Sequence, residues 1–207
     1  MRIAIDIQGC QSAGSRVRGI GRYSVGIIKG LINASNENEI ILVSNASSYD
    51  CREYFGKELS SKNCNVSYCN WFPIYSAATE SEQSLLHTKT LSYIRAYTFS
   101  KLNADIILIT SFFEGWGDGC FIPISKEFNL PPVFSIVYDL IPYIYQDDYL
   151  NNIPEYKEFY LNKLSGLKEL NGFLAISESA KREGIKYLDI DPDKIFNISS
   201  ACDLEIF

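Results

Sequence analysis

Length, composition and charge set the first limits on what this chain can be. Its 207 residues are enough for one large domain or two small ones, and 46% hydrophobic against 21% charged residues is ordinary globular composition. The net charge of −6 argues against general nucleic-acid binding, because phosphates attract basic surfaces. The longest apolar runs, near 106–113 and 133–137, fall short of the roughly 20 residues of a membrane span.

Strand-like and helix-like stretches alternate along the chain. Strands are predicted at 3–7, 39–44, 65–69, 105–110, 133–138, 172–176 and 194–198. Helices are predicted between them at 21–32, 49–59, 80–102, 153–170 and 178–188. This alternation predicts an α/β fold with a Rossmann-like, doubly wound, mainly parallel sheet, built as a single domain over 1–207. Ligands of such sheets bind at the carboxyl ends of the strands.

Two of the predicted helices carry recognisable faces. The helix at 21–32 places Tyr23, Ile27, Ile28 and Leu31 on one side, which we expect to face the core. The helix at 80–102 has an apolar stripe with basic residues between its members, and two tyrosines accompany them: Lys89, Tyr93, Arg95, Tyr97 and Lys101. Such a set indicates either a membrane-surface contact or a solvated helix face, and we favour the solvated face.

The first β–α corner concentrates glycine and positive charge. Gln8 and Gly9 follow the first strand, and Arg18-Gly19-Ile20-Gly21-Arg22 opens the next helix. Glycines allow a ligand to approach the backbone, and a helix start favours anions. We therefore expect a diphosphate site at Arg18, Gly19, Gly21 and Arg22, although a glycine turn with solvated arginines accounts for the pattern equally well. Neither the dinucleotide fingerprint nor the P-loop pattern is present.

Polar and aromatic residues also follow the later strands. The stretch 111–119 contains Glu114 and Trp116 among three glycines, which suits a sugar-facing loop, whereas composition alone favours a turn whose aromatics cap the core. Asp139 follows Tyr138 at the end of a buried strand and either orients a ligand or caps the next segment. Ser177, beside Glu178, has the position of a helix N-cap, and the same helix start could face a ligand.

The six cysteines and single histidine do not form a metal-binding pattern. No C-x-x-C pair occurs, so a Cys/His zinc site is not expected. The cysteine spacing is irregular, and no signal-peptide pattern precedes the first strand. We therefore expect buried or incidental thiols in a cytoplasmic protein, with at most peripheral contact at the inner face of the membrane.

Four ordered landmarks resemble the N-terminal half of family 4 (group 1) GT-B glycosyltransferases. Gln8-Gly9 followed by Arg18-Gly19-Ile20-Gly21-Arg22-Tyr23-Ser24 is similar to the first strand-loop-helix of that family. Tyr138-Asp139-Leu140-Ile141-Pro142 resembles its (H/Y)DLIP segment, and Ala175-Ile176-Ser177-Glu178-Ser179 a later strand–helix junction. The stretch 197–207 resembles the exit from the first Rossmann domain. The nearest likeness is to mannosyltransferase-like members that build bacterial surface polysaccharides.

The resemblance implies a function and a missing partner domain. It implies a retaining, metal-free transfer from a nucleotide-sugar, GDP-mannose or a UDP-sugar, to a saccharide or lipid-linked acceptor, with no other cofactor. The family's second Rossmann domain carries a pair of glutamates eight positions apart, and this sequence has no such pair. We therefore expect the chain to be inactive alone. Tyr138 stands where many members have a donor-contacting histidine.

The resemblance also assigns roles to individual residues. It implies catalytic-site positions for Tyr138 and Asp139, and acceptor or sugar contacts for Gln8, Glu114, Trp116, Ser177 and Glu178. Two rivals stay open: a stand-alone sugar- or nucleotide-binding module without catalysis, and a different one-domain α/β enzyme such as a reductase. The missing third glycine of a dinucleotide fingerprint argues against the reductase.

Overall fold

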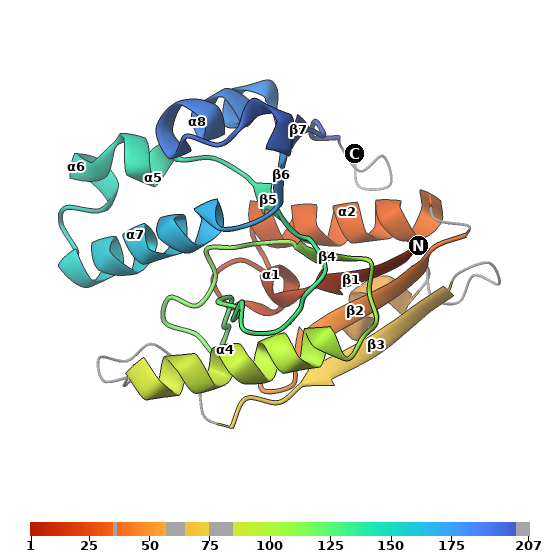
Figure 1. Cartoon of the computed structure of the whole chain (residues 1–207). Coiled ribbons are helices and arrows are strands. Elements are labelled where there is room, and N and C mark those ends of the chain that lie inside the picture. Colours follow the sequence, from red (N-terminus) through yellow and green to blue (C-terminus); the bar gives the residue numbers. More distant parts are fainter. Residues whose placement is uncertain (35–36, 57–64, 75–84, 202–207) are drawn as a thin grey trace. The chain divides into compact units, whose positions relative to one another are not determined.

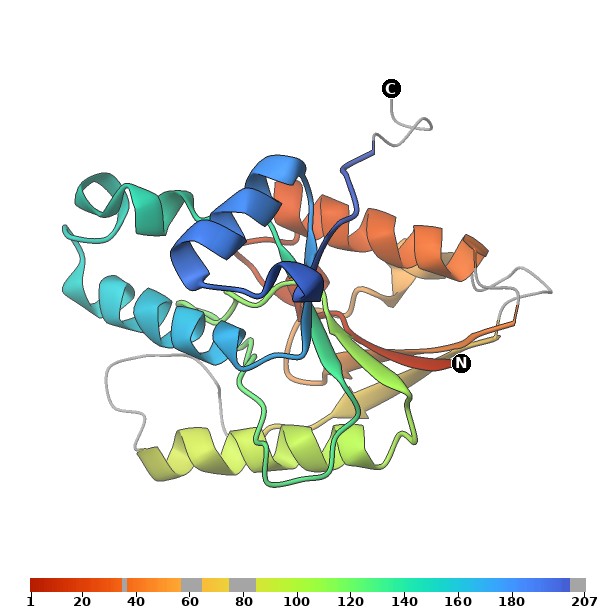
Figure 2. The same ribbon diagram turned by 45° about the horizontal axis from the view of Figure 1, so that its top comes forward.

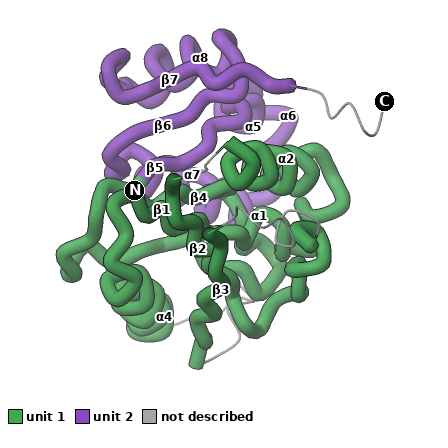
Figure 3. The backbone as a smooth tube through the Cα atoms, turned by 90° about the vertical axis from the view of Figure 1, so that its right-hand side faces the viewer, with its two compact units in different colours: residues 1–133 green, residues 134–207 purple. Residues whose placement is uncertain are grey.

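A computed structural model describes residues 1–34, 37–56, 65–74 and 85–201, and Figure 1 shows the helices and strands. The chain divides into two compact units, Met1–Val133 and Phe134–Phe207 (Figure 3). Each unit has its own strands and its own helices.

The first unit is built on four parallel strands. They are β1 (Arg2–Asp6), β2 (Glu39–Asn45), β3 (Asn65–Trp71) and β4 (Ile106–Ile109), in the order β3-β2-β1-β4. In the register of β1, Ala4 lies opposite Ile41 on one side and Ile107 on the other. These three residues are buried, as expected for central strands covered on both faces.

Helices cover both faces of this sheet. A short helix, α1 (Gln8–Gln11), follows β1 directly and leads into α2 (Gly19–Ala34). A 3₁₀ turn, η1 (Arg52–Phe55), follows β2, and α4 (Leu85–Ser100) precedes β4. Figure 1 and Figure 2 show α2 and α4 on opposite sides of the strands, which is the doubly wound arrangement.

The second unit repeats the strand–helix pattern. Its parallel strands are β5 (Val133–Val137), β6 (Gly172–Ala175) and β7 (Ile195–Asn197), in that order. Between β5 and β6 lie two short helices, α5 (Ile141–Ile144) and α6 (Gln146–Tyr149), and the longer α7 (Pro154–Lys168). Between β6 and β7 lie α8 (Glu178–Leu188) and the turn η2 (Pro192–Lys194). The predicted Rossmann-like α/β fold is thereby confirmed.

The seven predicted strands are confirmed, and two of the predicted helices fall partly on residues that the structure does not describe. Of 49–59, the turn Arg52–Phe55 and the following Gly56 are helical, and 57–59 lie outside the described residues. Of 80–102, residues 80–84 lie outside the described residues, and α4 runs from Leu85 to Ser100, two residues short of the predicted end. The short helices α1, α5 and α6 were not predicted, because four-residue helices have no room for a periodic pattern.

The buried face of α2 differs from the predicted one. Its buried residues are Gly21, Ser24, Ile28 and Ile32, while Tyr23, Ile27 and Leu31 are only half-buried. Small residues occupy this face because neighbouring backbone lies close to it. A Cβ on Gly9 of α1, for instance, would come within 2.9 Å of the Ser24 hydroxyl.

Membrane contact was predicted to be peripheral at most. Within the described ranges, no helix combines the length and apolarity that crossing a membrane requires.

Candidate functional site

A fully buried ion pair lies at the carboxyl end of β1. Asp6, the last residue of the strand, accepts a hydrogen bond at 2.8 Å from the Arg95 guanidinium of α4. Neither side chain is exposed to solvent. The other terminal nitrogen of Arg95 donates to the carbonyl of Ile122. The prediction that Arg95 lies on a solvated helix face is therefore wrong.

Gln8 completes this buried group. Its amide nitrogen donates to Asp6 at 3.1 Å and to the Phe121 carbonyl at 2.9 Å. Its amide oxygen accepts from the Phe121 N–H at 2.8 Å and from the Asn45 amide at 3.3 Å. Gln8 is fully buried, so this environment leaves it no surface for the sugar contact expected of it. Its role here is to join α1 to the 111–123 segment.

Further polar contacts tie α1 to the ends of β2 and of the 111–123 segment. Gln11 exchanges hydrogen bonds with the backbone of Asn45, and the Asn45 amide donates to the Gly119 carbonyl at 2.9 Å. The Ser12 hydroxyl lies 2.5 Å from an Asp118 carboxylate oxygen. The carboxyl edge of this sheet is thus a network whose members satisfy one another.

The arginine–glycine corner is open by comparison. The Gly21 N–H donates to the Ser15 carbonyl at 3.0 Å, so it is not free to bind a phosphate. A Cβ on Gly21 would meet backbone atoms of Ser15 and Arg16, whereas one on Gly19 would meet nothing within 4 Å. Gly21 is therefore needed for packing, and Gly19 is the glycine that allows close approach.

Two exposed cations stand at this corner. The side chains of Arg18 and Arg22 are exposed and have no hydrogen-bond or ion-pair partner within the described residues. Arg16 behaves differently, because its guanidinium lies 4.4 Å from the ring centre of Tyr49. The geometry therefore singles out Arg18 and Arg22, beside the positively polarised start of α2, as groups ready to meet an anion.

The loop after β4 has one buried and one exposed candidate residue. Glu114 is buried and accepts a hydrogen bond from Ser111 at 2.7 Å. Trp116 is 43% exposed and lies between Gly115 and Gly117, both of which have positive φ. Positive φ suits glycine, and here it turns the chain so that Trp116 is presented to solvent. Trp116 is therefore accessible to a ligand, whereas the buried Glu114 holds the loop through its bond with Ser111.

In the second unit, Asp139 caps the segment that follows it. One of its carboxylate oxygens accepts from the N–H of Ile141 at 3.0 Å, and the residue is exposed. The adjacent N–H of Leu140 donates to Glu183 of α8 at 3.2 Å. Tyr138 is half-buried. The capping role, one of two that the sequence left open for Asp139, is therefore present, and the side chain remains accessible.

The start of α8 shows the predicted helix cap. The Ser177 hydroxyl accepts from the N–H of Ala180 at 3.1 Å. Glu178 is exposed and accepts from the Asn197 amide at 3.3 Å. Both residues thus follow the carboxyl end of β6, and Glu178 contacts the last residue of β7.

Three cysteines of the first unit are buried as free thiols. Cys10, Cys51 and Cys120 each have a pKa raised mainly by burial, that of Cys51 to about 12. Thiols in this state are protonated at neutral pH and unreactive. Among the described residues, no group of three or more His, Cys, Asp or Glu is placed to hold a metal ion.

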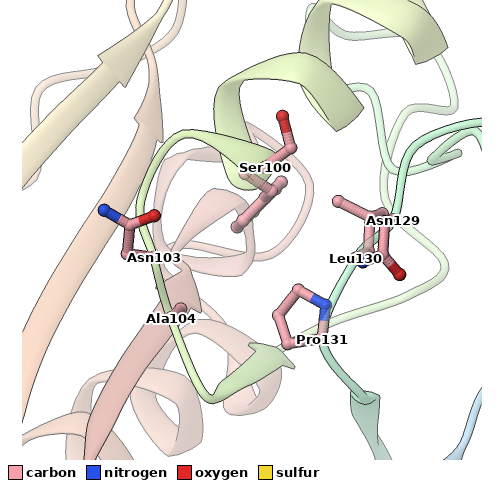
Figure 4. Close-up of a pocket in the computed structure, with 7 residues that line it drawn as sticks. Ser100, Asn103, Ala104, Asn129, Leu130 and Pro131 are labelled. Carbon is pink, nitrogen blue, oxygen red and sulfur yellow. The ribbon is translucent and has the colours of Figure 1, made fainter.

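The first unit also has an open hollow at the other edge of its sheet. The hollow has a volume of about 410 Å³. Figure 4 shows residues that line it, among them Ser100, Asn103, Ala104, Asn129 and Pro131. Asn103 and Ala104 precede β4, so the hollow is at the amino end of that strand. It contains none of the residues predicted for the site.

Sequence comparisons identify homologues of this chain. Over 97% of its length it is 30% identical to the serotype-specific mannosyltransferase WbdA of Escherichia coli. A second E. coli protein of the same name is 36% identical over 114 residues, 55% of this chain. The chain spans 24% of the length of the first protein, and its match to the second covers 14%. No family model matches the sequence.

Solved structures with a similar fold include a glycosyltransferase and a protein solved with a UDP-sugar. A glycosyltransferase of Rickettsia africae ESF-5 matches 99% of this chain and 44% of its own, with a TM-score of 0.51 and 18% identity. UGT2 of Phytolacca americana, solved with UDP-2fluoro-glucose and pterostilbene, matches 98% of this chain and 55% of its own, with a TM-score of 0.53 and 11% identity. The chain is therefore a homologue of the WbdA mannosyltransferase and has the Rossmann-like α/β fold of glycosyltransferases.

Proposed function

We propose that this chain is the acceptor-binding half of a retaining glycosyltransferase. The reaction moves a sugar, mannose in the first instance, from a nucleotide-sugar to a growing surface polysaccharide or glycolipid. The observation that carries this proposal is the identity to a mannosyltransferase along 97% of the chain. Because the chain spans only 24% of that relative, the proposal includes a second Rossmann-like domain that binds most of the donor.

The charges of the first unit support a diphosphate contact. A departing nucleoside diphosphate carries negative charge that fixed cations and helix starts stabilise. Arg18 and Arg22 are exposed cations at the first turn of α2, and Gly19 leaves its backbone open to approach. In the proposed enzyme these three residues face the diphosphate of GDP-mannose or a UDP-sugar. Gly21 supports their position without contacting it.

Saccharide contacts are assigned to the exposed groups at the strand ends. Tyr138 and Asp139 position hydroxyls of the sugar or acceptor, and Ser177 and Glu178 lie at the neighbouring strand end of the same unit. Trp116 offers an aromatic face to a pyranose ring, and the buried Glu114 belongs to the same loop. Transfer takes place in the cytoplasm, at the inner face of the membrane, when the second domain closes over these groups.

The diphosphate role is tested with matched arginine variants. Arg18→Ala/Arg22→Ala is compared with Arg52→Ala, whose guanidinium is already paired with Asp50. The assay follows mannose transfer from GDP-mannose to a mannose oligosaccharide by the polypeptide that contains both domains. We expect kcat/KM for the donor to fall about 10- to 100-fold in the first variant and to stay unchanged in Arg52→Ala. Equal donor kcat/KM values in the two variants would show that Arg18 and Arg22 do not contact the diphosphate.

The isolated chain separates this proposal from a stand-alone binding module. Titration of the 207-residue chain with GDP-mannose is expected to give no sub-millimolar affinity, and the chain is expected to transfer no sugar. Sub-millimolar binding without transfer would favour the binding module, since a complete site would then exist without the second domain.

A further inference from the structure

We propose that Arg95 is a positioning residue for acceptor recognition. It holds the segment 111–123 in the shape that presents Trp116 to the acceptor saccharide. The inference rests on the proposed function, because it concerns the acceptor side of the same reaction.

One guanidinium joins three parts of the first unit. Arg95 leaves the middle of α4 and pairs with Asp6 at the end of β1 at 2.8 Å. Its other terminal nitrogen donates to the Ile122 carbonyl and lies 3.5 Å from the Pro123 carbonyl. The carboxyl end of the 111–123 segment is therefore attached to both a strand and a helix.

The same segment is held at three further points. Phe121 exchanges two hydrogen bonds with the Gln8 amide, which Asp6 holds in turn. The Gly119 carbonyl accepts from Asn45, and Asp118 pairs with Ser12. Hydrogen bonds to Ser12, Asn45, Gln8 and Arg95 thus hold the stretch 118–123 in place. The exposed Trp116 lies two residues before this stretch, so the anchors fix the position at which the turn that carries it ends.

The chemistry of Arg95 suits this task better than core stabilisation. A buried ion pair pays a large desolvation cost, and apolar side chains of similar volume often stabilise a core as well. The Arg95 Nε has no hydrogen-bond partner, although it is buried, which adds to that cost. What an apolar side chain cannot do is donate to the Ile122 carbonyl while holding Asp6. The pair therefore specifies where the loop lies.

Tryptophan fluorescence can report on the loop directly. The chain has two tryptophans, and Trp71 is buried while Trp116 is exposed. In a Trp71→Phe background, acrylamide quenching follows Trp116 alone. We compare Arg95→Lys and the charge-free pair Asp6→Asn/Arg95→Met with Leu91→Ala. Leu91 is buried one turn earlier on α4, so its truncation weakens the same helix while it leaves the Asp6–Arg95 pair intact.

The expected result is specific to the acceptor. Both Arg95 variants should change the quenching of Trp116 and raise KM for a mannose oligosaccharide about 10- to 100-fold in the two-domain polypeptide, with KM for GDP-mannose unchanged. Leu91→Ala should change neither quantity. Unchanged quenching, or equal changes in both KM values, or the same changes in Leu91→Ala, would overturn the positioning role.

Failure of this inference is distinguishable from failure of the proposed function. The quenching comparison needs no activity, so it decides whether Arg95 fixes the loop even if the two-domain polypeptide transfers no sugar. If quenching changes while both KM values stay as in the wild type, Arg95 holds the loop without serving the acceptor, and the inference is overturned while the proposed function stands.

Discussion

The polar side chains at the strand ends of the two units differ in where their hydrogen bonds go. After β1 and β2, Asp6, Gln8 and Asn45 are buried and bonded to one another or to backbone. After β5 and β6, Asp139 and Glu178 are exposed, and each carboxylate accepts a hydrogen bond through one of its two oxygens. A polar residue at the end of a buried strand can therefore belong to the scaffold, and its burial distinguishes it from one that is accessible to a ligand.

The largest expected effect lies in the buried network. Asp6→Ala leaves the Arg95 cation buried without its partner, and we expect it to lower the free energy of unfolding by about 3–5 kcal/mol. Glu178→Ala, at an exposed strand end of the other unit, should cost less than about 1 kcal/mol. Urea denaturation of both variants measures the difference, and similar losses would erase the distinction between scaffold and exposed groups.

The two glycines of the arginine corner should respond differently to added side chains. Gly21→Val forces a Cβ against backbone of Ser15 and Arg16, so we expect a loss of about 1–3 kcal/mol. Gly19→Ala meets no neighbour and should be neutral or slightly stabilising. Thermal unfolding checks both. A stable Gly21→Val chain would show that the turn adapts and would return Gly21 to the candidate diphosphate contacts.

The buried thiols predict a loss of stability in alkali. The pKa of Cys51 is raised from 9.0 to about 12, so the folded state holds its proton in a range where the unfolded state loses it. The protonated Cys51 thiol therefore contributes fully to the free energy of unfolding below pH 9. This contribution is lost as pH rises from 9 towards 12, and the free energy falls by up to about 1.4 kcal/mol per pH unit. Urea titrations of the wild type and Cys51→Ala should show a shallower slope in the variant. Parallel slopes would exclude a raised pKa.

The smallest expected effect concerns the cap of α8. Ser177→Ala removes the acceptor for the Ala180 N–H and should cost about 1 kcal/mol. Ser179→Ala, on the exposed first turn of the same helix, is the matched control and should cost less. Comparable losses would mean that Ser177 matters for something other than the cap.

Periodicity predicted the strands and most long helices because those patterns are local. The direction of a side chain at a strand end is not local, since it depends on which distant segment covers it. Arg95 illustrates this: it was grouped with Lys89 and Lys101, yet it lies four residues from both Leu91 and Phe99, on the buried stripe of α4. This four-residue spacing from two apolar residues is the signal in the sequence that indicates a buried position for Arg95. The bonds from Gln8 to Phe121, across 113 residues, had none.

The most direct test of the proposed activity is mannose transfer from GDP-mannose to a mannose oligosaccharide. It is measured for the isolated chain, for the two-domain polypeptide and for its Arg18→Ala/Arg22→Ala variant. We predict no transfer by the chain alone, transfer by the two-domain polypeptide, and a donor kcat/KM reduced about 10- to 100-fold in the variant. Full transfer by the variant, or by the isolated chain, would contradict the account.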